Sequence, residues 1–428
     1  MNNLSTSKPS RLQNTWSRMP WATFLFLLAV FAFATPLIKF AKGVRPDSAL
    51  AMNELLLQGT WYRQVALIAL AAFALFNLLR NKSRRFQING PLGWLILFYL
   101  VWAILSITWS INPLFTLKRV GILLILSMGA LYVANRLSLQ ETIALVFFMC
   151  AITIFGGLVF LITHYSFFPF RGGWRFGGTV HPIVQGWHCG LLMLSAFALS
   201  EKAEQNRALY IGIAFIAFLL LIITRSRGPF LAFFMGTAVY WSLLTTKRYQ
   251  GVLFLLGIII FGSLMYFMLG YELVHYGGQM TMTLGRIGQV EQTTTLTGRT
   301  PLWTAAMILV DQRPFVGYGY ESFLTAQNLA WITKKIGWAT PSVHSGYIYT
   351  LGGLGYIGGV SLVLILFLSV KKSIGLARRN PEYAFVAAVF VWLSINMIIE
   401  DQILTRPYFP VFLWMILLAR LGFIREKR

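Results

Sequence analysis

The sequence has few charged residues and almost no cysteine. Only 11% of its 428 residues are charged, whereas 57% are hydrophobic. This balance excludes a soluble domain, because apolar segments of roughly bilayer-spanning length recur along the whole chain. The two cysteines, Cys150 and Cys189, lie inside such segments, so we expect neither a disulfide nor a metal site. Charged residues are also missing from the middle of the segments, where the few polar residues are Gln185, His188, Ser195, Ser394 and Asn396, and this weighs against transport.

About twelve apolar segments predict an all-α polytopic membrane protein. The first segment follows a basic stretch, as a signal peptide does, but its length favours a helix that is retained. The predicted spans lie near residues 21–38, 64–79, 93–109, 119–134, 142–163, 182–199, 208–223, 228–244, 251–270, 345–369, 383–399 and 408–424.

The spans divide the chain into three parts: residues 1–270 with nine spans, a polar loop over 271–343, and residues 344–428 with three spans. A loop of that length is unlike an ordinary helix connection, which has only a few residues. It contains two segments that predict short amphipathic helices. One starts near Arg299, with Thr297 or Thr300 as its cap, and the other covers about 321–335.

Basic residues predict the orientation of the spans. Most of those in short connections fall on the face that carries both termini, so we expect both termini in the cytoplasm. The long loop then lies on the outer face. The clusters of basic residues on the cytoplasmic face are explained by membrane topology alone, so we expect no nucleic acid partner. Arginines exceed acidic residues on the outer face as well, where no topological rule explains them, and this excess suggests an anionic ligand.

Several outer-face arginines are candidates for that anion. Arg225 and Arg227 lie in the tight turn between the seventh and eighth spans, and Arg286, Arg299 and Arg313 lie in the long loop. Guanidinium groups bind phosphate through two parallel hydrogen bonds, and a lipid pyrophosphate would lie at this level of the membrane. The alternative is that the two turn arginines reach towards lipid headgroups, and the sequence does not decide between these interpretations.

His344 stands where the long loop re-enters the membrane. A single histidine is more often structural, but this one lies beside a basic loop, and imidazole is a suitable general base near neutral pH. Glu400 or Asp401, in the last outer connection, could orient it. No pair of acids outside the membrane has the spacing of a metal-binding motif, so we expect chemistry without a metal or cofactor.

The chain resembles the superfamily of bacterial O-antigen ligases and polymerases, and more narrowly the O-antigen ligases. The resemblance runs from about Arg225 to Ile357. It rests on the outer arginine turn, the Gly298-Arg299-x-x-x-Trp303 segment, the run RPFVGYGYESF and the run HSGYIYTLGGLGYIG. These elements are specific to the superfamily but poorly specific between ligase and polymerase.

The resemblance implies a GT-C-like fold of the bacterial inner membrane with its active site facing the periplasm. It implies an inverting glycosyl transfer from an undecaprenyl-pyrophosphate-linked glycan to a sugar hydroxyl of the lipid A–core of lipopolysaccharide, among membrane lipids. The residues carried over are His344, Arg299, one of Arg225 and Arg227, and one of Glu400 and Asp401.

Three alternatives follow from the same sequence. An O-antigen polymerase or a protein O-oligosaccharyltransferase would use the same architecture with another acceptor. A lipid-linked glycan flippase or exporter is the alternative of another class, and the missing midplane charges argue against it.

Overall fold

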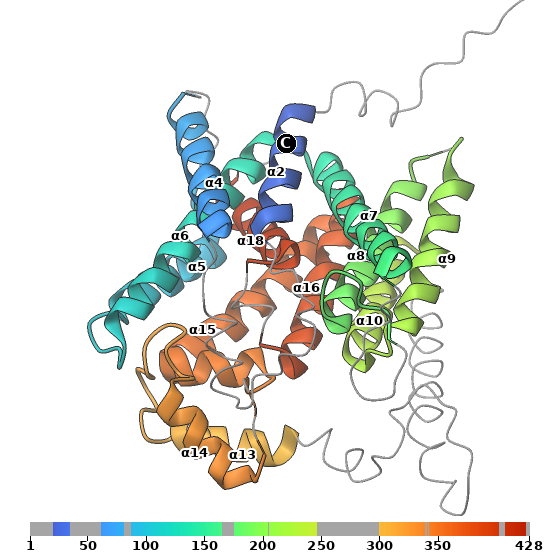
Figure 1. Ribbon diagram of the computed structural model, residues 1–428. Helices are drawn as coiled ribbons and strands as arrows, with labels where there is room; N and C mark the ends of the chain where they lie inside the picture. The colour runs from blue at the N-terminus through green and yellow to red at the C-terminus, as the bar shows by residue number, and fades with distance from the viewer. Residues whose placement is uncertain are drawn as a thin grey trace, which may run out of the picture.

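The computed structural model describes residues 20–34, 61–80, 87–164, 175–203, 205–245, 299–338, 340, 342–401 and 407–424. This part of the chain folds into α-helices joined by turns and short connections (Figure 1). The helices are α2 (Trp21–Ala34), α4 (Trp61–Arg80), α5 (Gly90–Leu105), α6 (Pro113–Arg136), α7 (Leu139–His164), α8 (Pro182–Ser200), α9 (Arg207–Ile223), α10 (Arg227–Leu244), α13 (Arg299–Val310), α14 (Ala326–Ile336), α15 (Gly346–Ala377), α16 (Glu382–Ile399) and α18 (Phe409–Phe423).

A helix is found at each predicted span within the described residues. Five of these helices, α6, α7, α8, α15 and α16, are long and apolar enough to cross a membrane by themselves. Five shorter apolar helices, α2, α4, α5, α9 and α18, accompany them. The prediction of a helical multi-pass membrane protein is confirmed. The span near 251–270 and most of the loop lie outside the described residues, so their number and placement stay predictions.

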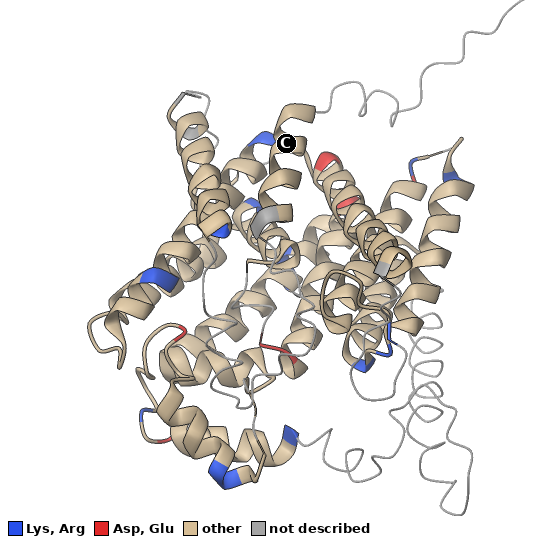
Figure 2. Ribbon diagram, in the orientation of Figure 1, with Lys and Arg blue, Asp and Glu red and all other residues tan. Residues whose placement is uncertain are grey.

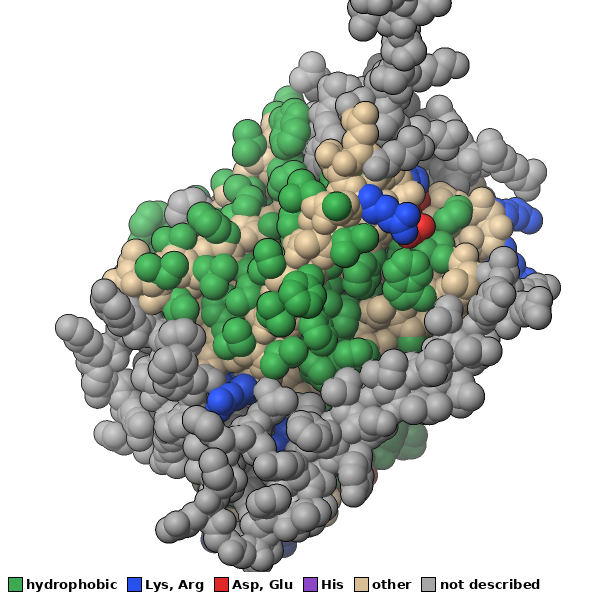
Figure 3. All heavy atoms as spheres, turned by 90° about the vertical axis from the view of Figure 1, so that its right-hand side faces the viewer, with side chains coloured by type: hydrophobic (Ala, Val, Ile, Leu, Met, Phe, Trp, Pro, Cys, Tyr) green, Lys and Arg blue, Asp and Glu red, His purple; other side chains and the backbone are tan. Residues whose placement is uncertain are grey.

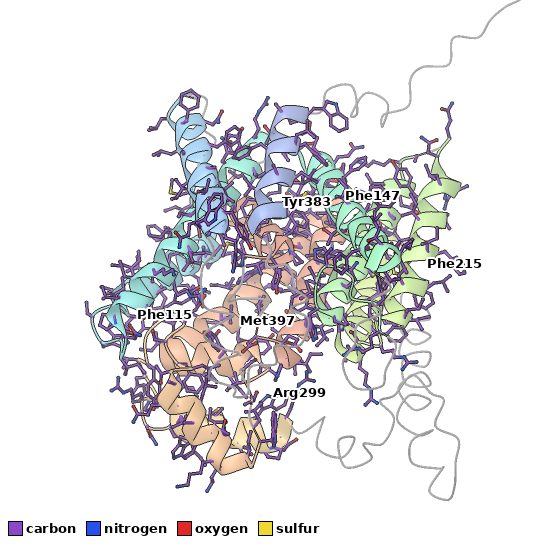
Figure 4. The ribbon with its side chains drawn as sticks, in the orientation of Figure 1. Phe115, Phe147, Phe215, Arg299, Tyr383 and Met397 are labelled. Atoms are coloured by element: carbon purple, nitrogen blue, oxygen red, sulfur yellow. The ribbon has the colours of Figure 1, made fainter. Side chains whose placement is uncertain are left out.

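The outer surface of the helix bundle is apolar where it would meet lipid. Helices α7 and α9 expose large hydrophobic side chains such as Phe155, Ile162 and Phe215. Figure 3 shows that such side chains cover the middle of one face, with charged residues at its edges. Phe215 points away from the bundle (Figure 4). A soluble protein would not expose an apolar surface of this extent, whereas a lipid environment favours it.

Helices α15 and α16 lie at the centre of the bundle (Figure 1). Helix α16 buries most of its length, including Tyr383, Phe390 and Trp392. The indole of Trp187 in α8 donates a hydrogen bond to the side chain of Asn396 in α16 at 3.0 Å. This bond satisfies two polar groups that would otherwise be costly inside the bilayer. Helix α16 is therefore held against α8, and Glu400 and Asp401 follow directly after its last residue, Ile399.

Helix α15 is broken near its N-terminal end. Gly355 has φ 68° and ψ −172°, a conformation that is essentially restricted to glycine. The turn after α13 packs into the break through three backbone hydrogen bonds. Tyr318 N–H donates to the carbonyl of Gly352 at 2.8 Å, and Gly319 N–H donates to that of Gly353 at 2.9 Å. In the other direction, Tyr356 N–H donates to the carbonyl of Pro314 at 2.6 Å. The hydrogen bonds at the break thus connect the turn after α13 to the first turns of α15.

Helix α14 begins later than the sequence suggests. The prediction placed its start at Glu321, but the helix starts at Ala326, after Thr325, whose hydroxyl accepts a hydrogen bond from Asn328 N–H. Glu321 has φ 58°, which no right-handed helix accommodates. Gly337, with φ 80°, ends the helix. The amphipathic helices of the loop are otherwise found where they were predicted. Thr300 is not the cap of α13, because the helix already begins at Arg299, and Thr297 lies outside the described residues.

Candidate functional site

Helix α13 positions Arg299, its first residue. One face of α13 is buried, with Leu302, Ala306 and Leu309 packed in a small core beneath the turn that follows it. The indole of Trp303 donates a hydrogen bond to the carbonyl of Val343 at 3.0 Å. Helix α13 is therefore joined directly to the residue that precedes His344.

Glu400 lies between Arg299 and His344. A guanidinium nitrogen of Arg299 is 3.2 Å from one carboxylate oxygen, and Nδ1 of His344 is 3.6 Å from the other. The side chain of Glu400 is 3% exposed, that of Arg299 20% and that of His344 28%. Figure 2 shows acidic residues at the lower end of α16, between basic residues at the start of α13 and at the turn between α9 and α10. Arg299 is labelled below that end of α16 in Figure 4. A buried carboxylate thus joins a cation and an imidazole that remain partly accessible.

Asp401 makes a different contact from Glu400. It accepts a hydrogen bond from the Ser342 hydroxyl at 2.6 Å, and the same hydroxyl accepts one from the His344 N–H at 2.9 Å. Asp401 therefore holds the backbone before His344, whereas Glu400 faces the imidazole. The sequence left these two acids equivalent, and the geometry separates them.

The charges of this group determine its protonation. Burial by itself would lower the pKa of His344, but the Glu400 carboxylate outweighs burial and raises this pKa above its ordinary value. Burial would raise the pKa of Glu400, but His344 and Arg299 outweigh it and lower this pKa. Glu400 is consequently an anion at neutral pH, and His344 is a stronger base than an isolated imidazole.

His344 has an uncommon backbone conformation. Among the described residues, three that are not glycine have a positive φ: Arg225 at 48°, Glu321 at 58° and His344 at 49°. Such residues cost about 1–3 kcal/mol each and occur mainly where function requires them. Two of the three were site candidates from the sequence.

The turn that carries Arg225 and Arg227 lies beside the end of α16. A Cβ atom on Gly228 would lie 1.7 Å from the Ile399 side chain, so the turn packs closely against the end of α16. Arg175 donates hydrogen bonds to the carbonyl of Thr224 at 2.9 Å and to the Ser226 hydroxyl at 3.1 Å. The backbone of the turn is thus fixed next to the residue that precedes Glu400. Both Arg225 and Arg227 are partly exposed.

Among the described residues, one predicted arginine, Arg313, is not part of this group. Arg313 lies beyond the opposite end of α13 from Arg299, and that helix is about 18 Å long at 1.5 Å per residue. It is exposed, and its guanidinium lies 5.1 Å from the centre of the Tyr318 ring. Arg286 lies outside the described residues.

Two polar residues that lie near these groups, Arg119 and His181, were not identified from the sequence. Arg119 in α6 forms an ion pair with Glu321 at 3.2 Å, and His181 caps α8 and lies close enough to Glu400 to lower its pKa. Each partner is some two hundred residues away along the chain, so no local motif joins them. The N-cap position of His181 before Pro182 is a recognisable signal for the helix start, but not for the site.

The fold and this group of residues define a class: a helical multi-pass membrane protein that holds arginine, histidine and carboxylate side chains together beside one end of its central helices. Residues 212–363 match the family model described as O-antigen ligase. The chain is also 27% identical over 352 residues, 78% of each chain, to the exopolysaccharide production protein ExoQ of Rhizobium meliloti (strain 1021). These two matches support an O-antigen ligase-type superfamily member.

Proposed function

We propose that this protein is an O-antigen ligase: it transfers O-polysaccharide from undecaprenyl pyrophosphate to a sugar hydroxyl of the lipid A–core on the periplasmic face of the inner membrane. The observation that supports this proposal most strongly is the buried Glu400 between Arg299 and His344. It brings a base and a phosphate-binding cation to one place, as a glycosyl transfer from a lipid pyrophosphate requires.

The arginines bind the donor in this proposal. When the bond between the sugar and the pyrophosphate breaks, negative charge develops on the departing oxygen. Arg299 can stabilise that charge, as a metal ion does in other transferases, with one of the turn arginines, Arg225 or Arg227, from the other side. Arg286 is a further candidate ligand. No nucleotide is needed, because the lipid pyrophosphate is itself the activated donor.

His344 acts as the general base. The acceptor oxygen attacks the anomeric carbon, its proton passes to the imidazole, and undecaprenyl pyrophosphate leaves with the bonding electron pair. A single displacement of this kind inverts the anomeric centre. Glu400 orients the imidazole and stabilises the imidazolium that forms, while Asp401 holds the backbone of His344 through Ser342.

A second candidate is a polymerase of the same superfamily, whose acceptor is another lipid-linked glycan. The name of the relative from Rhizobium meliloti, an exopolysaccharide production protein, favours this alternative. Both reactions share donor, base and leaving group, and they differ in the acceptor.

Transfer by the purified protein tests these proposals. The full chain, reconstituted in vesicles with undecaprenyl-pyrophosphate-linked glycan, is offered lipid A–core. The ligase gives a glycosylated core, and the rate is unchanged by a chelator if no metal takes part. A polymerase instead lengthens the lipid-linked glycan and leaves the core unmodified. The absence of both products, with donor and protein intact, would refute the proposed chemistry.

A further inference from the structure

A second polar cluster lies on the other side of the first turn of α15. It consists of Arg119, Glu321, Tyr99, Tyr320 and Tyr349, and we call it the Arg119–Glu321 cluster. The carboxylate of Glu321 is 3.2 Å from Arg119, whose guanidinium also lies 4.9 Å from the centre of the Phe115 ring. Tyr349 donates a hydrogen bond to the backbone carbonyl of Glu321 at 3.1 Å. Tyr99 and Tyr320 interact electrostatically with the Glu321 carboxylate. Phe115 marks this side of the molecule in Figure 4, across α15 from Arg299.

The backbone conformation of Glu321 is not required by the turn alone. The same turn contains two other residues with positive φ, and both are glycines, Gly317 and Gly319. Glycine would suit position 321 equally well on conformational grounds. The carboxylate is kept there despite a cost of about 1 kcal/mol or more, which indicates a role for the side chain.

The ion pair is also not needed to fix the turn. The N–H groups of Tyr318 and Gly319 are bonded to α15, and Tyr320 N–H donates to the Ser106 hydroxyl at 2.9 Å. The hydroxyl of Ser322 is hydrogen-bonded to that of Thr116 at 2.7 Å. These contacts secure the turn on both sides of Glu321. An ion pair in such a place contributes little net stability, because both charges must leave water.

The chemistry of the cluster differs from that of the group around Glu400. Arg119 and Glu321 balance each other, so the cluster offers no net charge to a pyrophosphate. The side chains of Arg119 and Glu321 are 12% and 8% exposed, so only the edges of a guanidinium donor and a carboxylate acceptor are accessible, beside tyrosine side chains that combine an apolar ring with a hydroxyl. This combination suits an uncharged molecule with many hydroxyl groups, which is the chemistry of a sugar.

The cluster is also connected to His344 through the start of α15. Tyr349 follows His344 by five residues and lies in the first turn of this helix, which begins at Gly346. Tyr347 lies between them in the chain, and its hydroxyl donates a hydrogen bond to the carbonyl of Ser394 in α16 at 3.0 Å. The first turn of α15 thus contacts α16 through Tyr347 and the Arg119–Glu321 cluster through Tyr349. We propose that the Arg119–Glu321 cluster binds hydroxyl groups of the acceptor glycan and presents it to His344. This inference rests on the proposed glycan transfer and assigns its acceptor site.

Glu321→Gln tests the inference, because it removes the charge and keeps the shape of the side chain. Binding of two soluble probes to the full-length protein in detergent is measured: the deacylated core oligosaccharide and the delipidated repeat oligosaccharide. We expect one of them to bind the wild-type protein, and Glu321→Gln to weaken it by about tenfold or more, since a hydrogen bond to a charged group is lost. In the transfer assay KM for that acceptor rises by the same factor, while kcat and donor binding stay within about twofold.

Two further variants separate a binding role from a structural one. The double exchange Arg119→Glu with Glu321→Arg keeps an ion pair but moves the carboxylate, and we expect it to leave acceptor binding weak. Glu201→Gln, in the exposed pair with Arg207, serves as the matched control and should bind as the wild type does. Thermal unfolding of each variant checks that the protein is folded.

Three results would overturn the inference: neither oligosaccharide binds the wild-type protein, Glu321→Gln binds them unchanged, or the double exchange restores binding. If an oligosaccharide binds through Glu321 but no transfer from the lipid-linked donor occurs, the acceptor site stands and the proposed function fails.

Discussion

Glu400→Gln is the most informative single change in the proposed site. It preserves the size of a side chain that is 3% exposed, and it removes the negative charge shared by Arg299 and His344. If His344 is the base, the change alters both the strength of that base and its orientation.

The size of the effect follows from the distances. Two unit charges 3.6 Å apart attract by at most about 4–5 kcal/mol at an effective dielectric constant of about 20, so loss of the carboxylate removes a large contribution that favours the protonated imidazole. In the wild-type protein Glu400 holds the pKa of His344 above its ordinary value. Without the carboxylate, burial and the Arg299 charge both act to lower this pKa. The protonated, inactive form of the base then persists only at lower pH.

The assay is the pH dependence of kcat/KM for glycan transfer. We expect the acidic limb of the wild-type profile above pH 6.5, where His344 loses its proton. In Glu400→Gln this limb moves to lower pH, and the plateau rate falls by about a hundredfold because the imidazole is no longer oriented. Asp311→Asn, an exposed carboxylate near the end of α13, serves as the control with an unchanged profile. An acidic limb that stays in place in Glu400→Gln would refute the role of His344 as the base beside this carboxylate.

Three other changes test the remaining parts of the site and fold. His344→Ala should lower transfer by about a hundredfold or more while donor binding persists, and near-normal transfer would exclude it as the base. Arg299→Lys should lower transfer by about tenfold or more, because lysine cannot form two parallel hydrogen bonds to phosphate. Arg207→Lys, at an exposed arginine, is the control. Equal transfer rates for the two variants would contradict a contact between Arg299 and phosphate. Gly355→Ala should lower the unfolding free energy by about 3 kcal/mol or more, since its Cβ would lie 2.2 Å from the carbonyl oxygen of Phe315. Gly375→Ala in the same helix, with nothing within 4 Å, should show no loss of Tm, and an equal loss would contradict the account of the break.

The amino-acid sequence by itself determined the helical membrane class and most helix positions. Long apolar runs have few alternatives in a bilayer, where each backbone polar group must be bonded within its own segment. It also pointed to His344, Arg299 and the pair Glu400 and Asp401, because polar residues at the ends of apolar helices are easily recognised. It misplaced the start of α14, since the left-handed conformation of Glu321 depends on contacts with α6 and α15.

Only the tertiary structure decided which of these residues meet. Arg299 and Glu400 are 101 residues apart in the chain, and their contact depends on α13 being joined to the broken helix α15. The same packing separated Glu400 from Asp401, left Arg313 outside the group, and brought Arg119 to Glu321. Such contacts depend on how helices cross and where a helix breaks, and they cannot be predicted from the spacing of residues along one helix.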